Sequence, residues 1–436
     1  MTSLTLRGSV VSKLIVACGT GQLFLLLALS RVDARVDTSW FLCLLAGVAL
    51  AYVTSVYLIS LDPPTSREYL LLCLLFAVIW RVMLVGGAPL ASDDVYRYIW
   101  DGRVQQHGYN PYTSVPNDPA LDSLHTELTR AIDPSSAVLP TVYPAAAELF
   151  FWVVTSVHES VSAMVIAVVL FDVLSIVVLW RWLVSMRRNV WLVLVYAWHP
   201  LVAVEGAGGG HIDLVGTLFV LSAAYALYAR HTLAASVSLA VAFSLKFLPV
   251  VLAPLLWRRI KIRDALFASG IVLLFYLPFM DSLLIPPVGS LPVYVAQWRF
   301  NGPVFAWFAS MVGAVGSVAI AVGGGVVVAI FARLRLPREA PEAWAWPMAT
   351  TLLLLPAVYP WYLVWLTPFL TSSRTWFLIP WTLGVLLTYV VWISQSTGGG
   401  WVLPVWVEPV EYGLLAGTVL FGWCVSRRRE PDSSIR

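Results

Sequence analysis

Charged residues are scarce in this chain: they make up 12% of its 436 residues, and the formal net charge is only +3. Soluble domains contain about 25% charged residues, so an ordinary water-soluble protein is excluded. The apolar residues form continuous runs without the alternation of a membrane β-barrel. We therefore predict an all-α polytopic membrane protein, and the small net charge gives no indication of a nucleic-acid partner.

Cysteine motifs and nucleotide-binding loops are absent from the sequence as well. The four cysteines lie in apolar runs without CxxC or Cys/His spacing, so we expect neither disulfides nor a zinc site. No GxGxxG or Walker-type loop indicates NAD or ATP chemistry. Without an internal repeat or a soluble domain, we expect one membrane domain over residues 1–436.

Apolar runs of about 20 residues are long enough to span a bilayer. The first run lacks a convincing cleavage site, so we interpret it as a retained span and not as a signal peptide. Together the runs predict a bundle of about 11–13 transmembrane helices. The predicted spans cover residues 9–30, 39–60, 69–88, 161–184, 190–206, 211–229, 232–256, 264–280, 303–332, 342–357, 359–372, 375–395 and 411–426.

Lysine and arginine gather in short segments beside the spans, which identifies the cytoplasmic side. Residues 257–263, 333–338 and the tail 427–436 carry such clusters. The polar loop 88–140 holds only three basic residues, so we place it, with the shorter loop 281–302, on the external side. The protein is thus expected in the inner or plasma membrane, with its active site on the periplasmic or extracytoplasmic face.

The topology of residues 142–256 stays open. If the short segment 142–157 lies along the interface, the polar turn 206–213 is external. A broken or re-entrant element near Lys246 and Pro249 is then needed for the later basic segments to return to the cytoplasmic side. If that segment crosses the membrane, the turn is cytoplasmic. We favour the first arrangement.

The segment ASDDVYRYIWDGRVQQHGYNPY, residues 91–112, is the most polar stretch in the first half of the chain. Ser92 is a typical N-cap and Gly108 a typical stop, which predicts a helix over residues 93–107. Asp93 and Asp94 occupy its first turn, where the helix dipole favours a carboxylate, so both are expected to be ionised at neutral pH. They are therefore able to accept a proton or bind a cation.

This helix is expected to lie at the membrane interface, with aromatic residues at headgroup depth. Ion pairs and an aromatic belt explain it without any function, whereas acids at a membrane edge are functional by default. Both interpretations stay open on physical grounds. By spacing, one face carries Asp94, Arg97 and Asp101, and the adjacent face carries Tyr96, Trp100 and Arg103.

The pattern SDD-x-YRY-x-WDGR-x4-GxNPY, followed by Tyr143-Pro144, resembles the first external loop of the GT-C glycosyltransferases. It is most similar to bacterial family 87-type alpha-mannosyltransferases that use polyprenyl-phosphate mannose, and to the catalytic subunit of GPI mannosyltransferase I. The resemblance implies a GT-C-like bundle with a long external loop that carries interfacial helices.

The resemblance also assigns roles to single residues. Asp93 falls on the first Asp of the DxD pattern of that subunit, and Asp101 on the Asp of its TDAA element. Val95 stands where the second Asp of DxD is expected, and Asp94 precedes that place by one. Asp93 is thereby implied as the base, while its partner and any metal requirement stay open.

A second polar cluster, WHPLVAVEGAGGGHID at 198–213, contains Glu205, His211 and Asp213. Charged groups are costly against hydrocarbon, so these side chains must face an interior or a mouth. The element resembles the HP-x3-E-x5-GHxD element of the same mannosyltransferases, which implies contacts with the acceptor or the donor phosphate. A polar turn that caps the next span explains it equally well.

Lys246 is a single cation in an apolar run, and Pro249 predicts a kink after it. The sequence SLKFLP resembles the K-x-x-P element of these enzymes, which implies a contact with the carrier phosphate. The alternative is an ion pair with an acid in a span, such as Asp172 or Glu205. Arg81, near the end of the third span, is expected to snorkel to the interface.

Aromatic residues near the C-terminus complete the resemblance. Tyr359 and Trp361 in YPWYLVWLTP lie on the HPWYLxW element, with Tyr359 where His is common. They are expected to stack on a sugar ring, to line a lipid groove, or to belong to an aromatic belt. Arg299, in the external segment QWRFNGP, is a further phosphate candidate or an interfacial anchor.

The resemblance thus implies an inverting hexosyltransferase that moves a sugar, by resemblance mannose, from a polyprenyl-phosphate donor to a lipid or glycan acceptor on the external face. Asp93 is the predicted base, and Asp94 supports it or holds an ion. No cofactor is certain, and a Mg²⁺ or Mn²⁺ on Asp93 and Asp94 is the one candidate. The predicted substrate-binding residues are Arg97, Asp101, Arg103, His211, Asp213, Lys246, Arg299, Tyr359 and Trp361.

A transporter or flippase of a lipid-linked sugar is the alternative, because the same charges could line its pathway. Such transporters have paired interrupted spans in corresponding halves of the chain. The sequence shows a single long, asymmetric external loop instead, which favours the enzyme.

Overall fold

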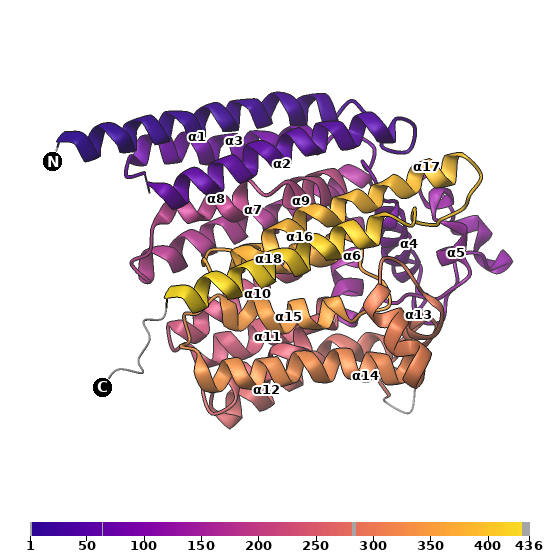
Figure 1. Cartoon of the computed structure of the whole chain (residues 1–436). Helices are drawn as coiled ribbons and strands as arrows, with labels where there is room; N and C mark the ends of the chain where they lie inside the picture. Colours follow the sequence, from indigo (N-terminus) through magenta and orange to yellow (C-terminus); the bar gives the residue numbers. More distant parts are fainter. Residues whose placement is uncertain (1, 63, 281–284, 430–436) are drawn as a thin grey trace.

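Long apolar helices form the body of the molecule (Figure 1), a computed structural model that describes residues 2–62, 64–280 and 285–429. Six described segments are long and apolar enough to cross a membrane, which confirms a polytopic, all-helical membrane protein. They are Val10–Leu29 of α1 (Thr2–Leu29), α2 (Thr38–Leu61), α7 (Val161–Ser185), Ile262–Phe279 from α12 (Ile262–Tyr276) and η6 (Leu277–Phe279), α14 (Pro303–Arg335), and Trp376–Ser396.

The other predicted spans form shorter or broken helices. The span predicted at 190–206 consists of two pieces, Val190–Ala197 and Pro200–Gly208, that meet at a bend of 53°. Because proline and glycine interrupt helical hydrogen bonding, apolar composition alone does not reveal such breaks. The remaining elements here are α3 (Arg67–Leu84), η3 (Val190–Val193), α8 (Leu194–Ala197), α9 (Pro200–Val202), the π-helix η4 (Ala203–Gly208), α10 (Asp213–Tyr228), α11 (Thr232–Leu245) and η5 (Leu248–Leu256).

The C-terminal part also consists largely of short or broken helices. The spans predicted at 342–357 and 359–372 form a 12-residue helix and a 3-10 helix, which contain Pro347 and Pro368. The predicted tail 427–436 lies, from residue 430, outside the described residues. The elements are α15 (Glu342–Leu353), η7 (Pro360–Phe369), η8 (Trp376–Leu378), α16 (Ile379–Gly384), η9 (Val385–Val390), α17 (Val391–Ser396) and α18 (Val407–Arg429).

Short helices gather at one end of the bundle. Figure 1 shows α4, α5, α13 and α17 at this end, with both chain termini at the opposite end. This arrangement agrees with the separation of external loops from basic cytoplasmic segments in the sequence. The short elements are α4 (Asp94–Gln106), η1 (Pro119–Leu124), η2 (Thr129–Ala131), α5 (Pro134–Ala137), α6 (Ala145–Val157) and α13 (Leu291–Gln297).

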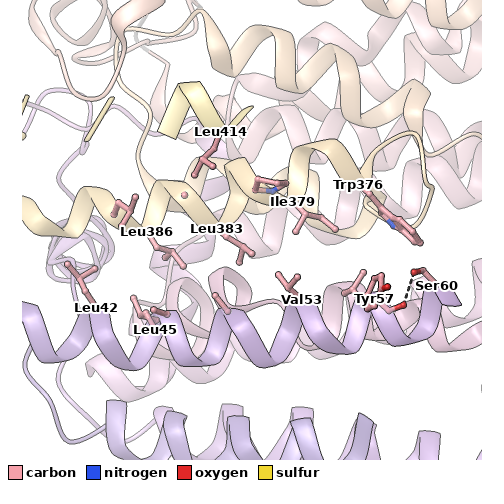
Figure 2. Close-up of a pocket in the computed structure, with 16 residues that line it drawn as sticks. Leu42, Leu45, Val53, Tyr57, Ser60, Trp376, Ile379, Leu383, Leu386 and Leu414 are labelled. Atoms are coloured by element: carbon pink, nitrogen blue, oxygen red, sulfur yellow. Dashed lines mark hydrogen bonds between the residues drawn. The ribbon is translucent and has the colours of Figure 1, made fainter. Parts of the chain in front are cut away.

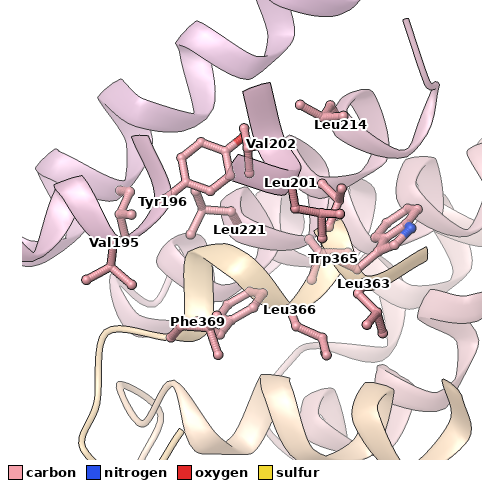
Figure 3. Close-up of a cluster of buried hydrophobic side chains, with 14 of the residues drawn as sticks. Val195, Tyr196, Leu201, Val202, Leu214, Leu221, Leu363, Trp365, Leu366 and Phe369 are labelled. Atoms are coloured by element: carbon pink, nitrogen blue, oxygen red, sulfur yellow. The ribbon is translucent and has the colours of Figure 1, made fainter. Parts of the chain in front are cut away.

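The apolar core lies where the broken helices meet. Burial of large side chains from several elements fixes their relative positions because protein interiors are close-packed. In Figure 3 the side chains of η7 lie beside those of α8, α9 and α10. The labelled core residues are Val195, Tyr196, Leu201, Val202, Leu214, Leu221, Leu363, Trp365, Leu366 and Phe369.

Arg81 does not snorkel to the interface, so that prediction is wrong. Its side chain is fully buried, and its guanidinium donates to the Asp172 carboxylate of α7 at 2.5 and 3.1 Å. It also donates to the carbonyl of Ala197, while the Tyr196 hydroxyl donates to Asp172. The buried ion pair thus joins α3, α7 and α8, and its partners neutralise a charge that would otherwise be costly.

Removal of one member of this pair should destabilise the fold. Arg81→Met leaves the Asp172 charge buried without its cation, which is expected to cost about 3–5 kcal/mol of unfolding free energy. The double variant Arg81→Met/Asp172→Asn carries no unpaired charge and should recover part of that loss. Thermal unfolding in detergent measures both; a single variant as stable as the wild type would contradict the structural role of the pair.

Candidate active site

The two adjacent acids lie at the start of α4. Asp93 occupies the N-cap position without a side-chain cap bond, and the Asp94 N–H donates to Ser92 Oγ at 3.3 Å. The helix therefore begins one residue later than predicted, with Asp93 at the cap in place of Ser92. Gly108 has a φ of +81° and follows the end of the helix as predicted. The carboxylate of Asp93 thus makes no cap bond to α4.

Helix α6 holds α4 in position. A Cβ on Gly102 would lie 2.5 Å from the Phe151 carbonyl oxygen, so only glycine permits this approach of the two backbones. The Tyr98 ring stacks on Phe151 with centroids 4.4 Å apart, and Gln106 donates to the Thr155 hydroxyl at 2.8 Å. Packing along the length of α4 thus fixes the place of the acids at its start.

The polar residues farther along α4 are engaged with protein groups. Arg97 pairs with Asp101 at 2.9 Å and donates to the carbonyls of Ser136 and Leu139. Arg103 pairs with Glu159 at 2.7 Å. The shared face of Arg97 and Asp101 is as predicted, and these contacts anchor the segment that follows α4 to this helix. No observation places these side chains against a substrate, so their binding roles stay predictions.

Trp100 does not face the bilayer, as a member of an aromatic belt would. Its side chain is fully buried and stacks on His125, with centroids 4.2 Å apart. The helical spacing identified its face correctly. It could not show that residues of the same external loop, Leu121 and Ile132, cover that face.

His211 lies between Asp94 and the buried Glu205, in the turn that its sequence predicted. Gly210 has a φ of +69°, and α10 begins at Asp213. His211 Nδ1 is 3.7 Å from Asp94 Oδ2, and its Nε2 is 3.4 Å from Glu205 Oε2. Burial, together with the charge of Lys246, lowers the pKa of His211 well below its usual range. This shift disfavours the charged imidazolium form, and the role of His211 in phosphate binding stays a prediction.

Lys246 forms an ion pair, as the alternative interpretation of its sequence suggested, but with a different acid. α11 ends at Leu245, and Lys246 is extended, which confirms the predicted break. Its Nζ donates to both carboxylate oxygens of Asp213 at 2.6 and 2.8 Å. The Trp365 indole also donates to Asp213, and Nζ lies 4.5 Å from the centroid of the Tyr362 ring. The charge of Lys246 is thus largely balanced within the protein.

An aromatic stack connects this cluster with the external segment. The ring centroids of Phe300 and Tyr359 are 4.5 Å apart, those of Tyr359 and Trp361 are 4.6 Å apart, and those of Trp361 and His211 are 4.1 Å apart. All three pairs are nearly parallel, so both faces of Tyr359 and Trp361 are covered by other rings. A sugar could meet only their edges, and the stack fixes the plane of His211.

The acids do not follow the expectation of full ionisation at neutral pH. Burial, with the charge of Asp93 added, raises the pKa of Asp94 to about 7, although 30% of its side chain is exposed. Burial also raises the pKa of Asp93, and the positive charge of Arg35 opposes this rise. Desolvation therefore outweighs the favourable helix dipole, and Asp94 changes its charge near neutrality.

Arg35 is the residue that sequence analysis missed. It lies in the turn between α1 and α2, and its charge acts on Asp93 although the two are far apart in the chain. If the loop 88–140, which follows the third predicted span, is external, the turn between the first and second spans is on the same side. An arginine there is unusual, because basic residues concentrate on the cytoplasmic side. Arg299, by contrast, is exposed and donates to the carbonyls of Val295, Ala296 and Trp298.

A metal site is not apparent among the described residues, where no group of three or more His, Cys, Asp or Glu side chains could hold an ion. Asp93 and Asp94 alone would supply two carboxylates. A bound Mg²⁺ or Mn²⁺ would need further oxygen ligands, such as water or a phosphate. The metal requirement thus stays a prediction.

Comparison with known proteins identifies one family. The family described as "Alpha-(1->6)-mannopyranosyltransferase, N-terminal domain", MptA_B, matches residues 6–259. The matched region contains the acid pair, His211, Asp213 and Lys246, whereas Arg299 and the Tyr359–Trp361 element lie beyond it. No match was found among curated proteins or among solved structures.

Gly102→Ala should displace α4 from α6. The added methyl group meets the Phe151 backbone, which cannot yield as a side chain can, and overpacking of this kind costs about 1–3 kcal/mol. We expect a lower melting temperature in detergent and faster hydrogen exchange of α4 amides. Gly86→Ala is the matched control, since a Cβ there meets nothing within 4 Å. Equal behaviour of the two variants would contradict the docking role of Gly102.

Proposed function

The chain belongs to the MptA_B family of alpha-(1->6)-mannopyranosyltransferases, and from this premise we propose that it transfers mannose from a polyprenyl-phosphate donor to a lipid or glycan acceptor. The family and the membrane-length helices show that the protein is an integral-membrane mannosyltransferase. The donor, the external location, the alpha-1,6 linkage and the catalytic base are the proposal.

One observation supports this proposal above the others. The two half-buried acids at the start of α4 lie beside the His211–Glu205 and Lys246–Asp213 groups, at the end of the bundle that carries the short helices. A lipid-linked donor must keep its chain in the membrane while its sugar reaches water. Acids at the mouth of a membrane bundle meet that requirement, and such acids are functional by default.

The proposed reaction is a single displacement. The acceptor hydroxyl oxygen attacks C1 of the mannose, the bond from C1 to the phosphate oxygen breaks, and polyprenyl phosphate leaves. The acceptor proton passes to the carboxylate of Asp93 as general base. Inversion at C1 turns a beta-linked donor into an alpha-linked product.

Asp94 supports the base through its charge. Two neighbouring carboxylates raise each other's proton affinity, so an ionised Asp94 makes Asp93 a stronger base. His211, which stacks on Trp361, lies 3.7 Å from the Asp94 carboxylate. If the reaction uses a divalent cation, Asp93 and Asp94 would hold it, and it would supply positive charge for the departing phosphate. Chelation by EDTA followed by addition of Mg²⁺ or Mn²⁺ tests this requirement.

Asp93→Asn should abolish most of the activity, because the amide keeps the shape of the carboxylate but cannot accept the proton. We expect a loss of about 10²–10⁴-fold in kcat, the usual contribution of a general base, and a smaller loss for Asp94→Asn. The assay uses purified protein, a short-chain polyprenyl-phosphate mannose and a mannoside acceptor, with product analysis by mass spectrometry.

The outcomes of this assay separate the alternatives. An active Asp93→Asn with an inactive Asp94→Asn would reassign the base to Asp94. If the wild type transfers no mannose from any lipid-linked donor but moves the lipid between bilayer leaflets, the protein is a transporter and the proposal fails.

The pH profile should report the coupled acids. Because Asp94 has a raised pKa of about 7, activity is expected at higher pH and should fall as the pH drops through about 7, when Asp94 gains a proton and Asp93 becomes a weaker base. In Asp94→Asn this limb should disappear, leaving a loss at lower pH where Asp93 itself is protonated. A wild-type profile that stays flat from pH 8 down to about 4, the ordinary value of a free Asp, would contradict the coupling.

A further inference from the structure

Arg35 has hydrogen-bond donors that the protein does not use. Its Nε and one of its Nη atoms are buried, and neither has a hydrogen-bond partner among the described residues. Buried donors normally have a partner, and guanidinium groups in particular are costly to leave unpaired. The unpaired donors therefore point to a ligand that is an anion.

The position of Arg35 is fixed beside the acid pair. Its guanidinium carbon lies 5.3 Å from the centroid of the Trp392 ring, and the Trp392 indole donates to the carbonyl of Ala91 at 3.2 Å. Ala91 precedes Asp93 by two residues. The positive charge of Arg35 opposes the effect of burial on the pKa of Asp93, which agrees with this placement.

Other cations near the site already have partners. Lys246 pairs with Asp213, and Arg97 pairs with Asp101. Arg299 donates to backbone carbonyls of its own segment. The departing phosphate in the proposed reaction needs a cation. One Nη of Arg97 also lacks a partner, but its other nitrogens are held by Asp101 and two carbonyls, whereas both Nε and one Nη of Arg35 are unpaired among the described residues.

An apolar groove lies beside α2, the helix that follows the turn with Arg35. It has a volume of about 530 Å³ and lies between α2 and the α16–η9 segment, with predominantly apolar lining that includes Leu42, Leu45, Leu383 and Leu386 (Figure 2). Beyond its Leu42 end the same elements stay in contact, because Phe41 of α2 packs edge-on against Tyr389 of η9. The turn with Arg35 precedes α2, and Trp392 follows η9.

We propose that Arg35 binds the phosphate of the lipid-linked donor and that the groove between α2 and α16–η9 holds the first isoprene units of its chain. This inference rests on the proposed function. The arginine fork can donate two parallel hydrogen bonds to phosphate oxygens. An apolar groove with a cation in the turn beyond its Leu42 end matches a lipid with an anionic head.

The placement also has a catalytic consequence. A phosphate bound to Arg35 cancels the positive charge that favours ionised Asp93. The proton affinity of Asp93 then rises, so donor binding itself strengthens the base.

Arg35→Gln tests the assignment by direct binding, without turnover. Binding of polyprenyl phosphate to the purified protein should weaken about 10- to 100-fold, the effect of losing charge-assisted hydrogen bonds. In the transfer assay the donor KM should rise by a similar factor with an unchanged acceptor KM. Arg35→Lys should restore part of the affinity, and Arg31→Gln, an exposed arginine of the same turn, is the control with unchanged binding.

A groove variant identifies the source of the phosphate. Ala49 lines the groove. Ala49→Trp should therefore weaken the binding of long-chain polyprenyl phosphate and leave the binding of inorganic phosphate unchanged. Unchanged polyprenyl-phosphate binding in Arg35→Gln would overturn the inference, and so would equal weakening in Arg31→Gln. Because binding is measured without turnover, wild-type protein that binds the lipid through Arg35 but transfers no mannose would refute the proposed function alone.

Discussion

The ion pair between Lys246 and Asp213 is the interaction on which the polar interior depends. A lysine inside an apolar bundle must be paired, and Asp213 meets it with both oxygens at 2.6 and 2.8 Å. To form this pair, α11 ends at Leu245 and α10 begins at Asp213, while Trp365 of η7 donates to the same carboxylate. The broken helices in the middle of the chain thus follow from one requirement, which is that buried charges find partners.

The same requirement distinguishes the groups that hold the fold from those available for chemistry. Arg81 pairs with Asp172, and Arg97 pairs with Asp101. In contrast, the Asp93 carboxylate makes no cap bond, and the Arg35 guanidinium has nitrogens without a hydrogen-bond partner among the described residues. Sugar transfer from a lipid phosphate needs two groups: an acid that can accept a proton, and a cation that can donate hydrogen bonds to the phosphate. Asp93 and Arg35 are such groups, and both lie at the mouth of the bundle. Both Asp93 and Arg35 lie within residues 6–259, the region that matches the family.

Local features could be predicted from the sequence because they depend on neighbouring residues. The helix at 93–107, its end at Gly108 and the break at Lys246 follow from caps, glycine, proline and apolar periodicity. The partner of Lys246, the burial of Trp100 and the place of Arg81 depend on distant segments that meet only in the fold. Arg35 was missed for the same reason: nothing near residue 35 in the chain shows that it lies beside Asp93.

A cryo-electron-microscopy structure with a non-transferable polyprenyl-phosphonate mannose tests the central claim most directly. We expect the phosphonate within hydrogen-bond distance of the Arg35 guanidinium, the isoprene chain between α2 and α16–η9, and C1 of the sugar beside Asp93 and Asp94. A phosphonate bound at Lys246 with the Asp213 pair broken, or a lipid at the end of the bundle that carries the chain termini, would contradict it.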